Sequence, residues 1–210
     1  MMNKQQINYL RFFFVLFYMV GALGMLVPQT HLLFRTITPY ALIMSTLILL
    51  LFHQSYSFKA IGVFILIAVF GFAIEVAGVN SGLIFGKYKY GPTLGPQWLN
   101  TPFLIGINWL LLTYTSAAIS GMLKMNVYLQ AILAAGLMLG YDFLLEPVAM
   151  KTGMWTWETG SIPLQNYIAW GVIALIFQLF IIQTRINLKN KLAAFIFGSQ
   201  LVYLLILQAL

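Results

Sequence analysis

Long apolar runs, each near the length that crosses a lipid bilayer, restrict the fold of this chain more than any other feature. Of its 210 residues, 61% are hydrophobic and 7% are charged. A transmembrane helix needs about 20 mainly apolar residues, and the chain contains about seven such runs. They are Leu10–Val27, Pro39–Phe52, Phe58–Val79, Pro102–Met122, Val127–Val148, Leu164–Gln183 and Leu192–Leu210. The second run is the weakest, and a start near Leu32 stays open.

These runs predict an all-α, polytopic bundle of transmembrane helices that forms a single integral membrane domain over residues 1–210. The bilayer core provides no water for unpaired backbone groups, so only helices and closed barrels span it. A barrel would show polar and apolar residues alternating at period two, and these runs do not. The composition also excludes a soluble globular domain.

The basic residues lie between the apolar runs. The formal net charge of +7 is therefore typical of membrane-protein loops, and we expect no nucleic-acid partner. One end of the bundle receives Lys4, Arg11, Lys59, Lys124, Arg185, Lys189 and Lys191, and the other receives Arg35, Lys87, Lys89 and Lys151. Because basic loops favour the cytoplasm, we expect a multi-pass protein of the cell membrane with a cytoplasmic N-terminus.

Acidic side chains are scarce, and their positions are unusual. The chain has four, of which Glu75, Asp142 and Glu146 lie in apolar runs, whereas Glu158 lies in a loop and is expected at the surface. A charge in lipid is costly and marks a functional site by default. Odd-numbered runs cross the membrane in the same direction, so the three carboxylates approach one membrane face. The sequence predicts that they form one cluster.

Asp142 and Glu146 are four residues apart and share one helix face. Two carboxylates in an apolar place repel each other, so we expect one to stay protonated beside an ionised partner. Such a pair is suited to acid/base catalysis. Pro147 follows directly and is expected to end or kink the helix.

Two other roles for the carboxylates stay open. In the first, they pair with Lys87, Lys89 or Lys151 and so hold loops to helices. In the second, the Asp-x-x-x-Glu spacing forms half of a magnesium–diphosphate site. Such metal sites use more acids than this chain contains. His31 and His53 have no second His or Cys at ligand spacing and are expected to be solvated. We therefore expect no metal. No nucleotide-binding glycine loop occurs, and we expect no cofactor.

Two long loops leave the membrane face that the carboxylates approach. Asn80–Thr101 and Ala149–Pro163 are rich in glycine, proline and aromatic residues, and together they hold three of the five tryptophans. Interfacial anchoring explains part of this pattern. The connections at the opposite face contain no tryptophan, however, and long loops with fixed turn residues are often functional. We expect both loops to cover the carboxylates.

Five motifs, in order over about residues 71–171, resemble those of the carotenoid 1,2-hydratase family of carotenoid biosynthesis membrane proteins. They are Glu75-x-x-Gly78-x-x-x-Gly82-x-x-Phe85-Gly86-x-Tyr88-x-Tyr90, Pro102-Phe103-x-Ile105-Gly106-x-Asn108-Trp109, Asp142-x-x-x-Glu146-Pro147-x-Ala149, Gly153-x-Trp155-x-Trp157 and Ile162-Pro163-Leu164-Gln165-Asn166-Tyr167-x-x-Trp170. The specificity lies in the ordered set. The first two apolar runs and the last add nothing to the resemblance.

The resemblance implies a cofactor-independent hydro-lyase that adds water across the terminal C1–C2 double bond of an acyclic carotenoid end group. Lycopene, γ-carotene or a related carotenoid would be the substrate, and a C1 tertiary alcohol the product. The partners are then a lipid-soluble carotenoid, water and the bilayer, and association with other carotenoid enzymes is a further expectation.

The resemblance and the shared membrane face together assign roles to eleven residues. Asp142 is the expected proton donor because it lies deeper in its helix than Glu146, and Glu146 or Glu75 takes a proton from the attacking water. The remaining residues are expected to line the substrate pocket, stabilise the cation or position water. They are Tyr88, Tyr90, Asn108, Trp109, Trp155, Trp157, Gln165 and Asn166.

Three alternatives stay open. A membrane carotenoid cyclase, such as a lycopene cyclase, would form the same cation and quench it by ring closure. A proton-coupled transporter would use the carboxylates as a relay, although no repeat relates residues 1–105 to 106–210, as transporters often show. A structural partner in a pigment-synthesis complex would have no chemistry of its own.

Overall fold

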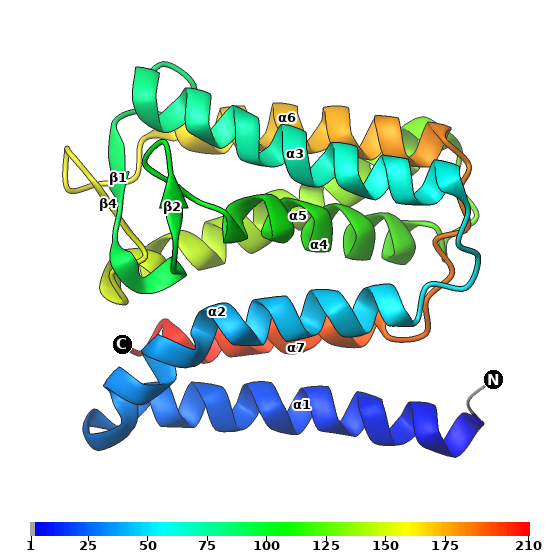
Figure 1. Cartoon of the computed structure of the whole chain (residues 1–210), viewed down its shortest axis with the longest axis horizontal. Coiled ribbons are helices and arrows are strands. Elements are labelled where there is room, and N and C mark those ends of the chain that lie inside the picture. The colour runs from blue at the N-terminus through cyan, green and yellow to red at the C-terminus, as the bar shows by residue number, and fades with distance from the viewer. Residues whose placement is uncertain (1–2) are drawn as a thin grey trace.

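The computed structural model describes residues 3–210, and within this range seven α-helices form a bundle (Figure 1). The helices are α1 (Lys4–Leu26), α2 (Pro28–Leu51), α3 (Phe58–Ser81), α4 (Leu104–Ser120), α5 (Val127–Lys151), α6 (Leu164–Gln183) and α7 (Ala193–Leu207). Five of these helices within residues 3–210 are long and apolar enough to cross a membrane, and α4 and α7 are shorter apolar helices. The predicted all-α bundle of transmembrane helices is confirmed.

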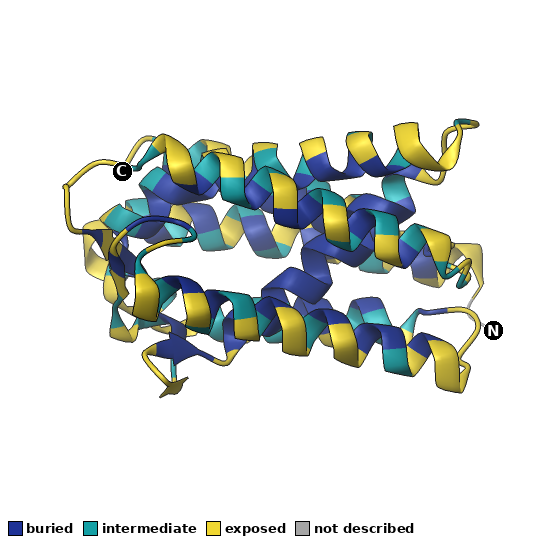
Figure 2. Cartoon of the chain, turned by 90° about the horizontal axis from the view of Figure 1, so that it is seen from above, coloured by how far each residue is buried: buried dark blue, intermediate teal, exposed yellow. Residues whose placement is uncertain are grey.

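Helix α4 lies at the centre of the bundle. It contacts α2, α3, α5, α6 and α7, and 15 of its 17 residues are buried. A helix surrounded by protein has no lipid-facing backbone to protect, so it need not match the bilayer thickness. Burial is concentrated inside the bundle, and exposed residues follow the outer faces of the surrounding helices (Figure 2).

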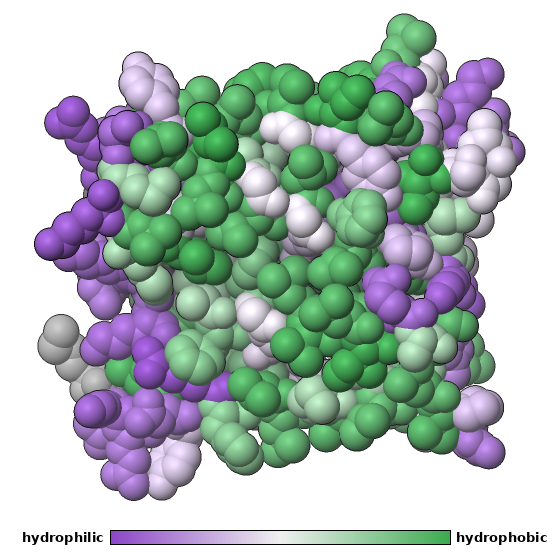
Figure 3. Space-filling model, turned by 180° about the vertical axis from the view of Figure 1, so that it is seen from behind, coloured by the Kyte–Doolittle hydropathy of each residue, from purple (hydrophilic) through white to green (hydrophobic). Residues whose placement is uncertain are grey.

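The outer faces of the bundle are apolar. Phe12, Leu32 and Phe70 are examples of large hydrophobic side chains that are exposed there. In Figure 3 a broad hydrophobic band occupies the middle of the molecule, and hydrophilic residues gather at its two ends. A soluble monomer rarely exposes apolar patches of this extent, whereas a membrane protein places them against lipid.

The structure corrects the second predicted span. Helix α2 begins at Pro28 rather than near Leu32 or Pro39, so Val27 alone separates it from α1. Proline is favourable in the first turn of a helix, because the N–H that it lacks would be unpaired there. Pro39 lies inside α2, where the membrane environment tolerates proline more readily than water does.

Pro147 was predicted to end or kink its helix, and the first of these two alternatives is wrong. Helix α5 continues to Lys151 with Pro147 inside it. In membrane helices, neighbouring helices and side chains compensate for the hydrogen bond that proline removes. Asp142 and Glu146 consequently lie on one continuous helix.

The two aromatic loops pair as short strands, an arrangement not predicted from the sequence. Strand β1 (Tyr88–Tyr90) is antiparallel to β4 (Trp155–Trp157), with Tyr88 opposite Trp157 and Tyr90 opposite Trp155. Side chains alternate between the two faces of a strand. The four aromatic residues therefore share the inner face, while the central Lys89 and Thr156 are exposed.

The segment between β1 and α4 contains the remaining short elements. A 3-10 turn, η1 (Pro92–Leu94), precedes strands β2 (Gln97–Trp98) and β3 (Thr101–Pro102), which pair with each other. η1 contacts α2. The β1–β4 ladder closes one end of the bundle (Figure 1), and η1 connects this end to α2 through direct contacts.

Candidate functional site

An interior cavity of about 140 Å³ lies between two groups of elements. Helices α1, α2 and α7, here called the α1–α2–α7 wall, line one side. Helices α3–α6 and the β1–β4 ladder, here called the carboxylate side, line the other. Glu75, Asp142 and Glu146 all border the cavity and are only 1–3% exposed. The structure therefore brings together three acids that are up to 71 positions apart in the chain.

Glu75 of α3 accepts three hydrogen bonds from neutral donors. The hydroxyls of Tyr88 and Tyr90 lie 2.7 and 2.8 Å from its Oε2, and Trp109 Nε1 lies 3.1 Å from its Oε1. Burial, reinforced by the charge of Glu75, raises the pKa of Tyr88 and that of Tyr90 well above the usual value for tyrosine. Both tyrosines therefore keep their protons and act as donors.

Glu146 of α5 has an equally complete set of partners. The indole nitrogens of Trp155 and Trp157 lie 2.9 and 2.8 Å from its Oε2, and Asn166 Nδ2 lies 3.0 Å from its Oε1. Because residues 155 and 157 lie on the same face of β4, one short strand supplies two donors to one oxygen. Hydrogen bonds to a carboxylate favour its charged form.

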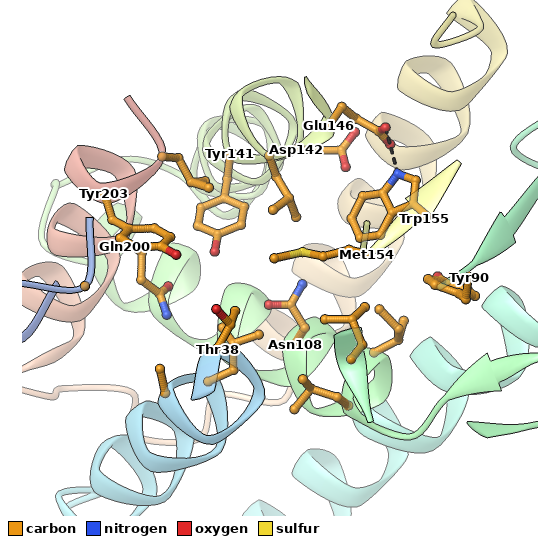
Figure 4. Close-up of a pocket in the computed structure, with 18 of the residues that line it drawn as sticks. Thr38, Tyr90, Asn108, Tyr141, Asp142, Glu146, Met154, Trp155, Gln200 and Tyr203 are labelled. Carbon is orange, nitrogen blue, oxygen red and sulfur yellow. Dashed lines mark hydrogen bonds between the residues drawn. The ribbon is translucent and has the colours of Figure 1, made fainter. Parts of the chain in front are cut away.

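Asp142 differs from both glutamates. Asn166 Nδ2 donates to its Oδ2 over 3.1 Å, while its Oδ1 is buried without a hydrogen-bond partner. An ionised carboxylate is an acceptor only, whereas a protonated carboxyl group carries an O–H donor. The donor sets thus suit ionised Glu75 and Glu146 beside a protonated Asp142. Figure 4 shows Asp142 and Glu146 at one end of the cavity, with Trp155 bonded to Glu146.

Among the described residues, no lysine side chain forms a hydrogen bond with the three carboxylates. Within residues 3–210, every hydrogen bond to the three carboxylates comes from a tyrosine, tryptophan or asparagine side chain. Lys87 and Lys89 are exposed, and Lys151 Nζ donates to the Gln208 carbonyl over 3.0 Å. The alternative in which these lysines hold loops to helices through the carboxylates is therefore wrong.

Three predicted residues take different places around the site. Asn108 lines the cavity, and its Oδ1 is buried without a partner. Trp109 lies behind Glu75 and stacks on Trp170 with ring centroids 4.0 Å apart, so it supports the site without lining the cavity. Gln165 is exposed and donates to two main-chain carbonyls of the loop after α3, and it does not line the cavity either.

Several cavity residues were not predicted from the sequence. Tyr18, Thr38, Gln200 and Tyr203 come from the α1–α2–α7 wall, and Tyr141 comes from α5. Figure 4 shows all of them except Tyr18 with labels. Gln200 could have been singled out in the sequence, because a polar amide side chain within an apolar span is costly and often marks a functional site. It donates to the Tyr18 hydroxyl over 2.8 Å, and its Oε1 has no partner. The other residues of the α1–α2–α7 wall have no sequence feature that would predict a place in the site.

His53 lies away from the site, near the opposite end of the bundle, and is not solvated as predicted. It is 6% exposed, its Nδ1 lies 2.8 Å from the Tyr114 hydroxyl, and burial lowers its pKa. Glu158 is exposed, as the sequence indicated. In the described part of the chain, no group of three or more His, Cys, Asp and Glu residues is arranged to hold a metal ion.

The fold and the site define a polytopic helical membrane protein with a buried cavity that carries three carboxylates. The chain belongs to the carotenoid biosynthesis protein family, whose sequence profile matches residues 36–208. This match extends beyond the motif region and includes most of α2 and all of α7. The predicted family is therefore confirmed.

The chain is also distantly similar to a curated protein. Over 173 residues the chain is 27% identical to a bisanhydrobacterioruberin hydratase of Haloarcula japonica, with 74% of this chain and 58% of the relative covered. The chain thus spans a little over half the length of that hydratase. No solved structure matches the chain.

Proposed function

We propose that this protein is a carotenoid hydratase, a hydro-lyase that adds water across the terminal C1–C2 double bond of an acyclic carotenoid end group. The family membership and the similarity to a hydratase support a carotenoid substrate and a hydration reaction. One structural observation supports the mechanism most directly. Asp142 has a buried oxygen without a partner, beside two glutamates whose oxygens all accept hydrogen bonds.

In the proposed reaction Asp142 donates its proton to C2 of the end group. The π electrons form the new C2–H bond and leave a tertiary cation at C1. The oxygen of a water molecule bonds to C1, and a proton leaves that water. The product is a C1 tertiary alcohol, and the proton count balances when Asp142 is reprotonated. This step uses only protons and water, in line with the expected cofactor independence.

Glu146 or Glu75 would accept the proton from the attacking water. Glu146 is favoured, because the Asn166 amide binds both Asp142 Oδ2 and Glu146 Oε1 and therefore couples donor and acceptor. A positioned acid or base typically contributes about 10²–10⁴-fold to a rate. Return of the water proton through this pair would regenerate the starting state.

The aromatic residues of the β1–β4 ladder suit a cationic intermediate. Tyr88, Tyr90, Trp155 and Trp157 border the cavity beside the carboxylates, and aromatic ring faces attract cations. The unpartnered Oδ1 of Asn108 is an acceptor that would orient the attacking water. A cyclase would form the same cation and close a ring instead, so the fate of the cation distinguishes the two functions.

The test is a pigment profile of cells that make lycopene or γ-carotene and express the wild-type protein, Asp142→Asn or Glu146→Gln. We expect a C1-hydroxylated carotenoid from the wild type and at least about 100-fold less from Asp142→Asn. Protein levels in the membrane fraction control for folding. Undiminished hydroxylation by Asp142→Asn would contradict its role as the acid, and cyclic products from the wild type would favour the cyclase.

A further inference from the structure

The cavity is small for its proposed substrate. Its volume is about 140 Å³, and an apolar cavity of about 150 Å³ holds a single benzene molecule. The end group of a carotenoid fits such a space, but the long polyene attached to it does not. If the proposed function holds, most of the substrate lies outside the cavity during the reaction, and the cavity needs an opening through which the chain passes.

The structure provides such an opening in the α1–α2–α7 wall. Val20 of α1 and Ile37 of α2 line the cavity, yet they are 49% and 38% exposed on the outer face of the bundle. Residues that border both spaces mark the place where the spaces meet. One helical turn further along α1, the helices are tightly packed, because a Cβ on Gly24 would lie only 2.2 Å from the Phe34 ring.

The surroundings of this opening are apolar. The cavity lining near it includes the apolar residues Phe17, Val20 and Gly21 of α1 and Ile37 and Ala41 of α2. The nearby Thr38 directs its hydroxyl to the Phe34 carbonyl over 3.0 Å. A rim without free polar groups suits a hydrocarbon and disfavours an ion, which argues against the transporter alternative.

The opening also faces the right medium. Val20 lies within α1, a helix long and apolar enough to cross a membrane, and its neighbours Leu16 and Leu23 are exposed apolar residues. Lipid tails are as apolar as leucine side chains, so the polyene would gain little by moving from lipid into protein. Leaving it in the bilayer while one end enters the cavity is therefore the least costly arrangement.

We propose that the gap between α1 and α2 at Val20 and Ile37 is a lateral portal, through which the polyene of an acyclic carotenoid extends from the catalytic cavity into the bilayer. This inference rests on the proposed function. It implies that the enzyme takes one end of the substrate at a time directly from the lipid phase.

A second cavity offers a competing route. It has a volume of about 570 Å³ and lies between α2 and α4, where the exposed Tyr40 and Phe103 line it. Leu94 and Leu104 border both cavities, but both side chains are buried and separate the two spaces. The polyene would use this route only if that partition moved.

The chain contains no cysteine, which permits a reversible test of the portal. Single variants Val20→Cys and Ile37→Cys are prepared in membranes together with a carotenoid substrate. A bulky, membrane-permeant methanethiosulfonate is attached and later removed with a reductant. Leu23→Cys on α1 and Leu33→Cys on α2 are matched controls, because both residues are exposed outside the cavity lining. Tyr40→Cys reports on the competing route.

We expect unmodified Val20→Cys and Ile37→Cys to hydrate the carotenoid. Modification should lower the rate at least tenfold, reduction should restore it, and the modified controls should stay active. Full activity of both modified portal variants, or a block at Tyr40→Cys alone, overturns the portal but leaves the proposed function intact. If the wild-type protein forms no hydroxylated product, the proposed function fails, and the portal fails with it. Ile37→Cys provides the answer if Val20→Cys does not fold.

Discussion

The two sides of the cavity differ in the polar groups that they bury and in how those groups are hydrogen-bonded. On the carboxylate side, Glu75 and Glu146 each accept three hydrogen bonds from buried neutral donors. The α1–α2–α7 wall is mostly apolar, and Gln200 with Tyr18 forms its main polar contact at the cavity. An uncompensated charge inside a protein is costly. This difference supports the proposal that the carboxylate side carries out the chemistry, while the wall shapes the cavity and admits the substrate.

The tryptophans illustrate the same division. Interfacial anchoring explains Trp98, which is 58% exposed. Trp109, Trp155 and Trp157 instead donate their indole N–H groups to carboxylates, and Trp170 stacks on Trp109. Four of the five tryptophans therefore support the site. A residue type that is common at membrane surfaces serves here mainly as a buried hydrogen-bond donor.

The largest effect is expected from removing donors on the carboxylate side. The double variant Tyr88→Phe/Tyr90→Phe keeps both rings but leaves Glu75 Oε2 without donors. Each lost partner of a buried acceptor costs about 1–3 kcal/mol, and more for a charged group. We expect a free energy of unfolding lower by at least about 2 kcal/mol, measured by thermal or denaturant unfolding in detergent. A stability equal to that of the wild type would show that these bonds do not hold Glu75.

The pH dependence of the same pair gives an intermediate effect. The folded state raises the pKa of Tyr88 and Tyr90, so their stabilising contribution is complete below the unfolded-state value of about 10. It is lost as the pH rises above that value. The wild type should therefore lose its advantage over the double Phe variant above pH about 10 and keep it between pH about 7 and 9. Thermal unfolding of both proteins across this range measures the difference, and a gap that does not shrink at high pH contradicts the prediction.

The smallest effect is expected on the wall. Gln200→Leu removes an amide whose Oε1 already lacks a partner, and Tyr18 keeps the Ser45 hydroxyl at 2.7 Å. We expect the free energy of unfolding to change by no more than about 1 kcal/mol, with hydroxylated carotenoid still formed. Unfolding curves and pigment profiles measure both quantities. If Gln200→Leu abolishes hydration as Asp142→Asn is expected to do, the chemistry is not confined to the carboxylate side.

Much of the fold was predictable because membrane helices leave a strong local signal. Apolar runs predicted all seven helices of the described residues, and the order of those runs placed three scarce acids at one membrane face. The start of α2 at Pro28 was missed, because polar residues such as Gln29 and His31 diluted the signal in its first turns. The strand pairing of Tyr88–Tyr90 with Trp155–Trp157 was missed because three residues are too few for a reliable period-two pattern.

The candidate site was predictable in part. Nine of the eleven predicted residues line the cavity, and Trp109 and Gln165 do not. Their motif positions could not show this, because neighbouring helical residues point in different directions and only packing decides which of them faces a cavity. The catalytic roles remain predictions, as do the cytoplasmic N-terminus and the association with other carotenoid enzymes.

The sequence by itself determined the membrane-spanning helices, the family and the clustering of three carboxylates, because hydropathy, motif order and span direction are properties of the linear chain. Only the tertiary structure decided which carboxyl group keeps an oxygen without a hydrogen-bond donor, since Asn166, Trp155 and Trp109 reach the acids from separate elements. It also placed α1, α2 and α7, whose sequences are merely hydrophobic, around the far side of the cavity. Contacts between distant segments depend on three-dimensional packing, and no local pattern in this chain encodes them.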